Sequence, residues 1–200
     1  MRQLLINGCY NQQTFHLLKE LGVSCLGLDL RPRSPNLVTF SEMNQIISQE
    51  RSAKLFLIFE NEKLEIIKSS LDLLKHAQVD FILQMRDQKS SDYYHQLPGM
   101  IYWMFHPVAD WKNILLLNNV KGVILPYKMR DDIQVMPELW NIIEARSLEV
   151  VLHVDSIIDL YQLMEQEEIS ISFDLGEEFQ LGYRQMNLDK IKKLQIWREE

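Results

Sequence analysis

Residues 54–85 read KLFLIFENEKLEIIKSSLDLLKHAQVDFILQM, and this stretch contains the repeating unit of the fold. Lys54–Phe59 is a nearly continuous apolar run, which is typical of a strand covered on both faces. In Glu62–His76 the apolar residues recur at spacings of three and four, which predicts a helix with one apolar stripe. Val79–Met85 is a second apolar run. The stretch therefore predicts strand, helix and strand, the unit of a parallel α/β fold.

The same alternation continues along the whole chain without a linker. The other strand candidates are Gln3–Ile6, Cys25–Leu30, Met100–Phe105, Gly122–Leu125, Glu149–Val154 and Ile169–Phe173. The other helix candidates are Gln12–Leu21, Ser41–Gln49, Pro137–Arg146 and Ser156–Glu165, of which the second and the last begin with a serine suited to an N-cap.

Eight strands in 200 residues leave about 25 residues for each unit, so the connecting loops must be short. This count fits a small closed (β/α)8 barrel, a TIM barrel, formed by residues 1–200 as one domain. A doubly wound open sheet has the same periodicity, but no Gly-x-Gly-x-x-Gly turn follows the first strand. We therefore expect the barrel.

Composition narrows the function classes. With 28 acidic and 21 basic side chains the net charge is −7, which gives no general basic surface for nucleic acid. The longest apolar runs, such as Met100–Phe105, are far shorter than the ~20 residues of a membrane-spanning helix. The apolar patch Leu4–Ile6 is too short for a signal peptide.

The two cysteines, Cys9 and Cys25, have neither metal-binding nor redox spacing and suggest free thiols in a reducing compartment. We expect a cytoplasmic protein without cofactor or metal, whose partners are a small phosphorylated ligand or another protein.

Four stretches match, at similar spacing, the motifs of one known family. They are Leu5–Gly8, Leu21–Leu28 with Arg33-Ser34-Pro35, Leu57–Asn61 with Val79–Gln84, and Ile171–Ile191. On these residues the chain resembles phosphoribosylanthranilate isomerase, a (β/α)8-barrel enzyme of tryptophan biosynthesis. The resemblance extends nearly from end to end and implies the same barrel.

The resemblance also implies two catalytic positions. In the family, a Cys ending the first strand is the general base and an Asp ending the sixth strand is the general acid of an Amadori rearrangement, which converts an aminoaldose into an aminoketose. The matching positions hold Asn7 and Pro126. Neither residue titrates near neutral pH, whereas the reaction needs one group to give and one to take a proton. We therefore expect the parent activity to be lost.

The binding motifs implied by the resemblance are altered as well. Asn36 stands where the family has the Arg that binds the anthranilate carboxylate, and His153-Val154 replaces a Gly-Gly pair that cradles phosphate. Among the glycines of the phosphate loops, Gly176 is kept.

Four residues are candidates for binding a phosphorylated ligand: Arg33, Arg86, Lys128 and Gly176. Together with Arg31, the three cations could form a basic rim for an anion, since Arg grips phosphate or carboxylate in bidentate fashion. The alternative is scattered surface charge.

Three residues are weaker candidates for catalysis. His153 and Asp155 are two apart on a predicted strand, so their side chains face the same way, and a His held by a carboxylate can act as a base. Alternatively, His153 is structural and Asp155 helps to cap the next helix. Asp174 ends the last strand and is the third candidate.

Three functional hypotheses follow. The first is a non-catalytic or repurposed isomerase-like barrel that binds a phosphorylated metabolite or a protein partner. The second is an enzyme acting on a phosphosugar-like substrate through His153, Asp155 or Asp174. The third is a true aldose-ketose isomerase in which Cys9 and Asp131 replace the lost base and acid. A small apolar side chain filling the first loop and a solvated turn explain these two residues better. We expect the first.

Overall fold

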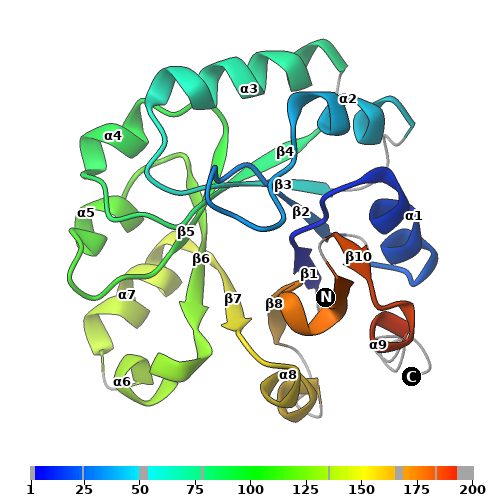
Figure 1. Cartoon of the computed structure of the whole chain (residues 1–200). Helices are drawn as coiled ribbons and strands as arrows, with labels where there is room; N and C mark the ends of the chain where they lie inside the picture. The colour runs from blue at the N-terminus through cyan, green and yellow to red at the C-terminus, as the bar shows by residue number, and fades with distance from the viewer. Residues whose placement is uncertain are drawn as a thin grey trace.

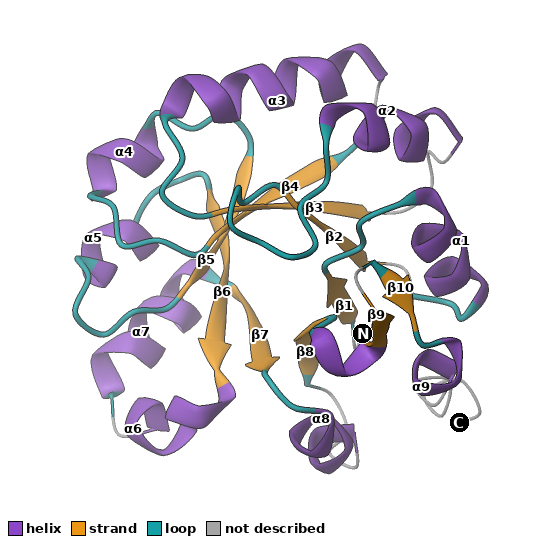
Figure 2. Ribbon diagram, viewed as in Figure 1, coloured by secondary structure: helices purple, strands orange, loops and turns teal. Residues whose placement is uncertain are grey.

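The computed structural model describes residues 3–192 except 24, 50–53, 78, 135, 165–168 and 183. Its centre is a closed barrel of eight parallel strands in chain order, drawn in orange in Figure 2. The strands are β1 (Leu4–Asn7), β2 (Cys25–Asp29), β3 (Lys54–Phe59), β4 (Phe81–Met85), β5 (Met100–Met104), β6 (Val120–Pro126), β7 (Glu149–Val154) and β8 (Ser170–Asp174). β8 pairs with β1, with Ile171 opposite Leu4. The predicted barrel is therefore confirmed, and the open sheet is wrong.

Helices surround the barrel on its outer side (Figure 1). They are α1 (Gln12–Glu20), α2 (Phe40–Gln49), α3 (Leu64–Ala77), α4 (Ser91–His95), α5 (Trp111–Leu115), α6 (Arg130–Gln134), α7 (Pro137–Arg146), α8 (Ile157–Met164) and α9 (Leu188–Lys192), with the 3-10 turns η1 (Tyr127–Met129) and η2 (Glu177–Phe179). After η2, β9 (Gln180–Gly182) and β10 (Gln185–Met186) form an antiparallel hairpin. Within the described ranges, none of these helices combines the length and the apolar character needed to cross a membrane.

The predicted strands all occur, with ends within two residues of the expected ones, and so do the five longer predicted helices. The last of these helices was expected to reach Glu165, which lies outside the described residues. The hairpin and the helices α4, α5, α6 and α9 were not predicted, because helices of five residues hold less than two turns of periodicity.

One predicted helix cap is wrong. The start of α2 was expected at Ser41, but Thr39 is the cap: its Oγ1 accepts from the Glu42 backbone N–H at 3.3 Å, and Glu42 Oε2 accepts from the Thr39 N–H at 2.8 Å. This reciprocal pair is a capping box. The predicted cap of α8 is confirmed, since Ser156 Oγ accepts from the Asp159 N–H at 3.1 Å.

The residues facing the inside of the barrel change from apolar to polar along the strands. Near the amino ends they form one small apolar cluster: Leu5, Cys25, Phe56, Ile82, Tyr102, Ile124 and Val151. Two residues further along β1, β4 and β7 stand the buried polar residues Asn7, Gln84 and His153. Because a strand repeats every two residues, these side chains face the same interior space. They therefore collect at the carboxyl-terminal mouth, where barrel enzymes hold their active sites.

Candidate functional site

The residues singled out in the sequence surround this mouth. They are Asn7 at the end of β1, Arg33 in the loop after β2, Arg86 directly after β4, Pro126 at the end of β6, Lys128 in η1, His153 in β7, Asp155 after β7, Asp174 at the end of β8 and Gly176 before η2. The contacts that they make decide which of them can still meet a ligand.

An ion pair crosses the mouth from β4 to β8, which are opposite strands of the closed barrel. Arg86 Nη1 lies 2.5 Å from Asp174 Oδ2, and Nη2 lies 2.6 Å from Oδ1, so the pair is bidentate. The Arg86 side chain is 7% exposed and that of Asp174 is 31% exposed. The guanidinium predicted to bind a ligand is therefore engaged by a carboxylate of the protein.

Two buried amides complete the hydrogen bonding of this ion pair. Asn7 Nδ2 donates to Ser172 Oγ and to Asp174 Oδ1, each at 2.8 Å. With its amide oriented to match its neighbours, Gln84 donates to Asn7 Oδ1 at 3.1 Å and accepts from Arg86 Nε at 3.0 Å. Asn7 thus uses both its N–H groups and its oxygen inside the protein.

A chain of hydrogen bonds continues from Ser172 to the edge of the mouth. Because Ser172 Oγ receives a hydrogen bond from Asn7, its own hydrogen is available for His153 Nδ1, 3.3 Å away. His153 Nε2–H then donates to Asp155 Oδ1 at 3.3 Å, and Lys128 Nζ lies 2.9 Å from Asp155 Oδ2. His153 and Asp155 are in contact, but both ring nitrogens of His153 are occupied. The hydroxyl that Nδ1 faces, Ser172 Oγ, is itself fully buried, so both partners of the ring lie inside the protein or at its edge.

The charges at the mouth keep its two carboxylates ionised. Burial of Asp174 favours its neutral form, but the adjacent Arg86 charge and hydrogen bonds outweigh burial and hold the pKa well below its usual range. For Asp155, the hydrogen bond from His153 is the largest influence, and together with Lys128 it outweighs the effect of burial and lowers the pKa well below its usual range. Neither carboxyl group therefore carries a proton to donate near neutral pH.

The depressed pKa of Asp174 predicts that the stability of the fold depends on pH. A carboxylate whose pKa is lower in the folded than in the unfolded chain stabilises the fold above about pH 4 and loses that contribution as the pH falls. We expect the difference in unfolding free energy between the wild type and Asp174→Asn to narrow as the pH falls from about 4 to 2. Urea titrations at each pH measure it, with the exposed Asp131→Asn as control. A difference that is constant with pH would contradict the prediction.

The residues suggested as displaced catalysts lie in unsuitable places. Cys9 is fully buried, and burial raises the pKa of its thiol far above the usual range, so the reactive thiolate is disfavoured. Asp131 is exposed in the first turn of α6, with its Oδ1 3.4 Å from Arg130 Nε. Pro126 ends β6 and is paired in register with His153. These positions support the structural interpretation of Cys9 and Asp131.

Asn36 ties the loop after β2 to the loop after β8. Its Nδ2 donates to the Leu175 carbonyl at 2.5 Å, and its Oδ1 accepts from Gln180 Nε2 at 2.9 Å. Gly8 makes this approach possible: its φ is +84°, and a Cβ there would lie 2.7 Å from Asn36 Nδ2. The position that the resemblance matches to a carboxylate-binding Arg is therefore a structural clamp.

The surroundings of Gly176 disfavour phosphate. Glu178 Oε2 lies 2.6 Å from the point where a Cβ on Gly176 would be, so a carboxylate fills the space beside the glycine. Glu177 adds a second exposed acid in the same turn. The negative charges of Glu177 and Glu178 repel an anion placed beside Gly176.

A pocket of about 670 Å³ lies at the rim, between the loops after β2 and β3, and Arg31, Arg33 and Lys63 are among the residues that line it. Arg31 is already paired: its Nη2 lies 2.6 Å from Asp29 Oδ2, and its Nη1 lies 3.4 Å from Glu60 Oε2. The Arg33 and Lys63 side chains are exposed and make no hydrogen bond or ion pair with any residue that the structure describes. This pocket therefore offers two uncommitted positive charges.

Two acids, Glu60 and Glu62, also line the rim pocket. Glu62 is 7% exposed, and its carboxylate accepts a hydrogen bond from the backbone N–H of Glu60. Burial raises the pKa of the Glu62 carboxyl group. Glu60 is exposed but faces Arg31.

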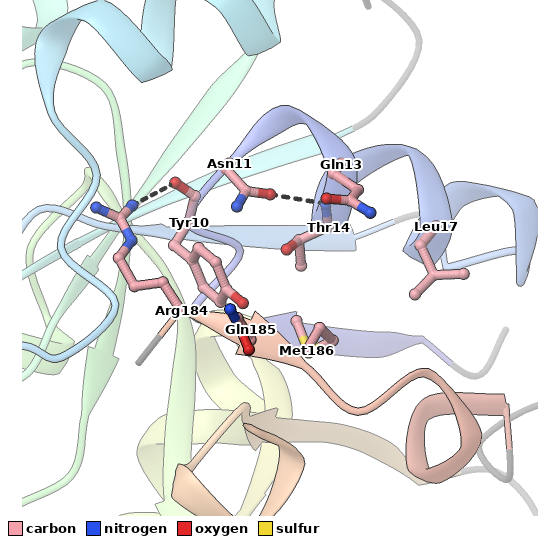
Figure 3. Close-up of a pocket in the computed structure, with 8 residues that line it drawn as sticks. All are labelled: Tyr10, Asn11, Gln13, Thr14, Leu17, Arg184, Gln185 and Met186. Atoms are coloured by element: carbon pink, nitrogen blue, oxygen red, sulfur yellow. Dashed lines mark hydrogen bonds between the residues drawn. The ribbon is translucent and has the colours of Figure 1, made fainter. Parts of the chain in front are cut away.

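A second pocket, of about 190 Å³, lies between α1 and β10 (Figure 3). Its cation, Arg184, is fully engaged: Nη2 donates to the Tyr10 carbonyl at 2.8 Å and to Glu42 Oε1 at 2.9 Å, and the guanidinium lies over the Tyr10 ring. The net charge of this arrangement is neutral. The rim pocket is therefore the better candidate for an anionic ligand.

Sequence reasoning missed Ser172 and Lys63. Ser172 could have been found, because it precedes Asp174 by two residues on β8 and must share its face. Nothing in the sequence distinguishes Lys63 from the other surface lysines.

Comparison with known proteins finds similarity at the level of structure. No protein-family model and no curated protein sequence matches it. The structure is similar to a monomeric form of phosphoribosylanthranilate isomerase from Thermotoga maritima, with a TM-score of 0.72 and 13% identity over 100% of both chains. A phosphoribosylanthranilate isomerase bound to reduced 1-(o-carboxyphenylamino)-1-deoxyribulose 5-phosphate has a TM-score of 0.71 and 14% sequence identity, over 98% of this chain and 97% of the other. The isomerase from Thermus thermophilus has a TM-score of 0.67 and 16% sequence identity, over 98% of each chain. At these identities the likeness shows an isomerase-like barrel fold, and function must be argued from the residues.

Proposed function

We propose that this chain is an isomerase-like barrel that has lost the isomerase reaction and binds a small anionic metabolite at its rim. The observation that carries the proposal is the buried network that joins Arg86 and Asp174 to Asn7, Ser172 and His153. It lies in the mouth, where a barrel enzyme would hold its reacting groups.

The chemistry of the network disagrees with proton transfer. The Amadori rearrangement of N-(5-phosphoribosyl)anthranilate needs a general acid and a general base. Asn7 and Pro126 do not titrate, the mouth carboxylates are held ionised, and both nitrogens of His153 are engaged. An enzyme with displaced catalytic residues, Cys9 and Asp131, is the alternative, and the burial of Cys9 weighs against it.

The rim pocket supports the binding part of the proposal. Arg33 and Lys63 are the cations that line it without a protein partner among the described residues. A guanidinium and an ammonium group together recognise phosphate or carboxylate. Of the four predicted ligand-binding residues, the proposed site keeps Arg33. Arg86 and Lys128 pair with protein carboxylates, and the Glu178 carboxylate occupies the space beside Gly176.

A direct assay tests the loss of activity. Purified protein incubated with N-(5-phosphoribosyl)anthranilate is expected to give no conversion above buffer, and the gene is expected not to complement a tryptophan auxotroph that lacks the isomerase. Turnover in the wild type that disappears in Cys9→Ser or Asp131→Asn would instead establish the alternative.

A thermal-shift experiment tests the binding site. Inorganic phosphate is expected to raise the melting temperature of the wild type by mass action and to have little effect on the Arg33→Gln/Lys63→Gln variant. Lys128→Gln is the matched control, because it removes one rim cation on another side of the mouth. Loss of the phosphate effect in Lys128→Gln alone would move the site to η1, and no effect on the wild type would refute anion binding.

A further inference from the structure

An apolar groove of about 290 Å³ adjoins the rim pocket, between α2 and α3, which lie next to each other at the top of Figure 1. Six apolar side chains line most of it: Leu30, Leu37, Val38, Phe40, Phe59 and Ile66. Phe40 and Ile66 are each 49% exposed. Large apolar side chains gathered in a groove with this exposure indicate a surface that a ligand can cover.

The groove and the rim pocket are parts of one continuous surface. Ile66 lines both. The chain also connects them twice: Leu30 lines the groove and the next residue, Arg31, lines the pocket, and the same holds for Phe59 and Glu60. A molecule bound at Arg33 and Lys63 can therefore extend past Ile66 into the groove.

We propose that the ligand is an amphipathic anion, with a carboxylate or phosphate head at Arg33 and Lys63 and an unbranched aliphatic chain in the groove between α2 and α3. This inference depends on the anion site proposed above and adds the chemical class of the ligand. Charge complementarity fixes the head, because the two uncommitted cations lie at one end and the groove itself carries no charged side chain among its lining residues. The apolar lining of the groove matches an uncharged hydrocarbon tail.

A chain-length series tests the inference on the whole protein. Dissociation constants for butanoate, hexanoate and octanoate are measured by calorimetry below their micelle-forming concentrations. Each methylene group that enters the groove is expected to tighten binding about fourfold until the groove is filled. Butyl, hexyl and octyl phosphate are expected to show the same gain in affinity per methylene group. A gain confined to the carboxylates or to the phosphates would show that the site requires one kind of head group.

Two variants locate the tail. Phe40→Ser and Ile66→Ser are each expected to flatten the dependence on chain length. Phe40 lines the groove and not the rim pocket, so Phe40→Ser is expected to leave the thermal shift with inorganic phosphate unchanged. Ile158→Ser is the matched control, because Ile158 is 67% exposed on α8, away from the groove. All three replace exposed side chains, so the fold is expected to persist.

The outcomes separate the two proposals. Equal affinity for butanoate and octanoate, together with a phosphate effect that depends on Arg33 and Lys63, would overturn the groove inference and leave the anion site standing. Tight octanoate binding that Phe40→Ser and Ile66→Ser do not change would also overturn it. Absence of binding by every anion would refute both.

Discussion

Replacing Arg86 by methionine is expected to lower the free energy of unfolding by about 3–5 kcal/mol, the usual cost of removing one partner of a buried ion pair. The Arg86 side chain is 7% exposed and donates two hydrogen bonds to Asp174. Without it, Asn7 is the one side-chain donor to the Asp174 carboxylate among the residues that the structure describes. Gln84 also loses the donors that its oxygen uses. Chemical denaturation monitored by circular dichroism measures the change.

Two further variants separate the ion pair from other effects of the substitution. Arg86→Met/Asp174→Leu is expected to recover part of the lost stability, because no charge is left unpaired. Arg33→Met, at an exposed position, is expected to change stability by less than about 0.5 kcal/mol. An Arg86→Met variant within about 1 kcal/mol of the wild type would show that the mouth is solvated and the network is not structural.

Gly27→Ala is expected to be similarly damaging, with a loss of about 3 kcal/mol or more from overpacking and broken hydrogen bonds. A Cβ on Gly27 would lie 2.2 Å from Asn7 Oδ1 and 2.9 Å from Asn7 Cα. The Asn7 side chain cannot move aside without breaking its bonds to Ser172 and Asp174. Its Cα belongs to β1, which pairs directly with β2.

Gly182→Ala is the matched control for this prediction. A Cβ at Gly182 would meet Gln185 Oε1 at 3.7 Å, an ordinary contact, so little change is expected. Adding Asn7→Ala to Gly27→Ala should restore part of the stability, because the nearest clash is then removed. If Gly27→Ala has the same melting temperature as the wild type, β1 does not pack against β2 at the mouth as closely as these distances indicate.

The fold was predictable because its signal is local and repeated. Apolar runs such as Lys54–Phe59 mark strands covered on both faces, and their number favours closure. The five-residue helices α4 and α5 carry too little periodicity to be recognised. The cap of α2 was misplaced because Ser41 and Thr39 are both suitable cap residues, and only the Glu42 contact selects the second.

Several members of the site were predicted, whereas Ser172, Lys63 and the contacts between the residues were not. Alternation along a strand placed Asn7, His153 and Asp174 at the mouth. That Arg86 binds Asp174 depends on the shape of the closed barrel, which brings residues 88 positions apart into contact. Of the cations expected to form a basic rim, Arg31, Arg86 and Lys128 pair with protein carboxylates, and Arg33 keeps its charge available. Lys63, which was not predicted, lies in the same pocket as Arg33.

The ion pair across the mouth has a consequence for synthesis on the ribosome. Arg86 emerges with the first four strands, whereas Asp174 ends the eighth, so half a barrel holds an arginine at its centre with its counter-ion still untranslated. Burying the Arg86 charge before Asp174 is synthesised would be unfavourable. We therefore expect the barrel to close only when the last strand brings Asp174 to the mouth.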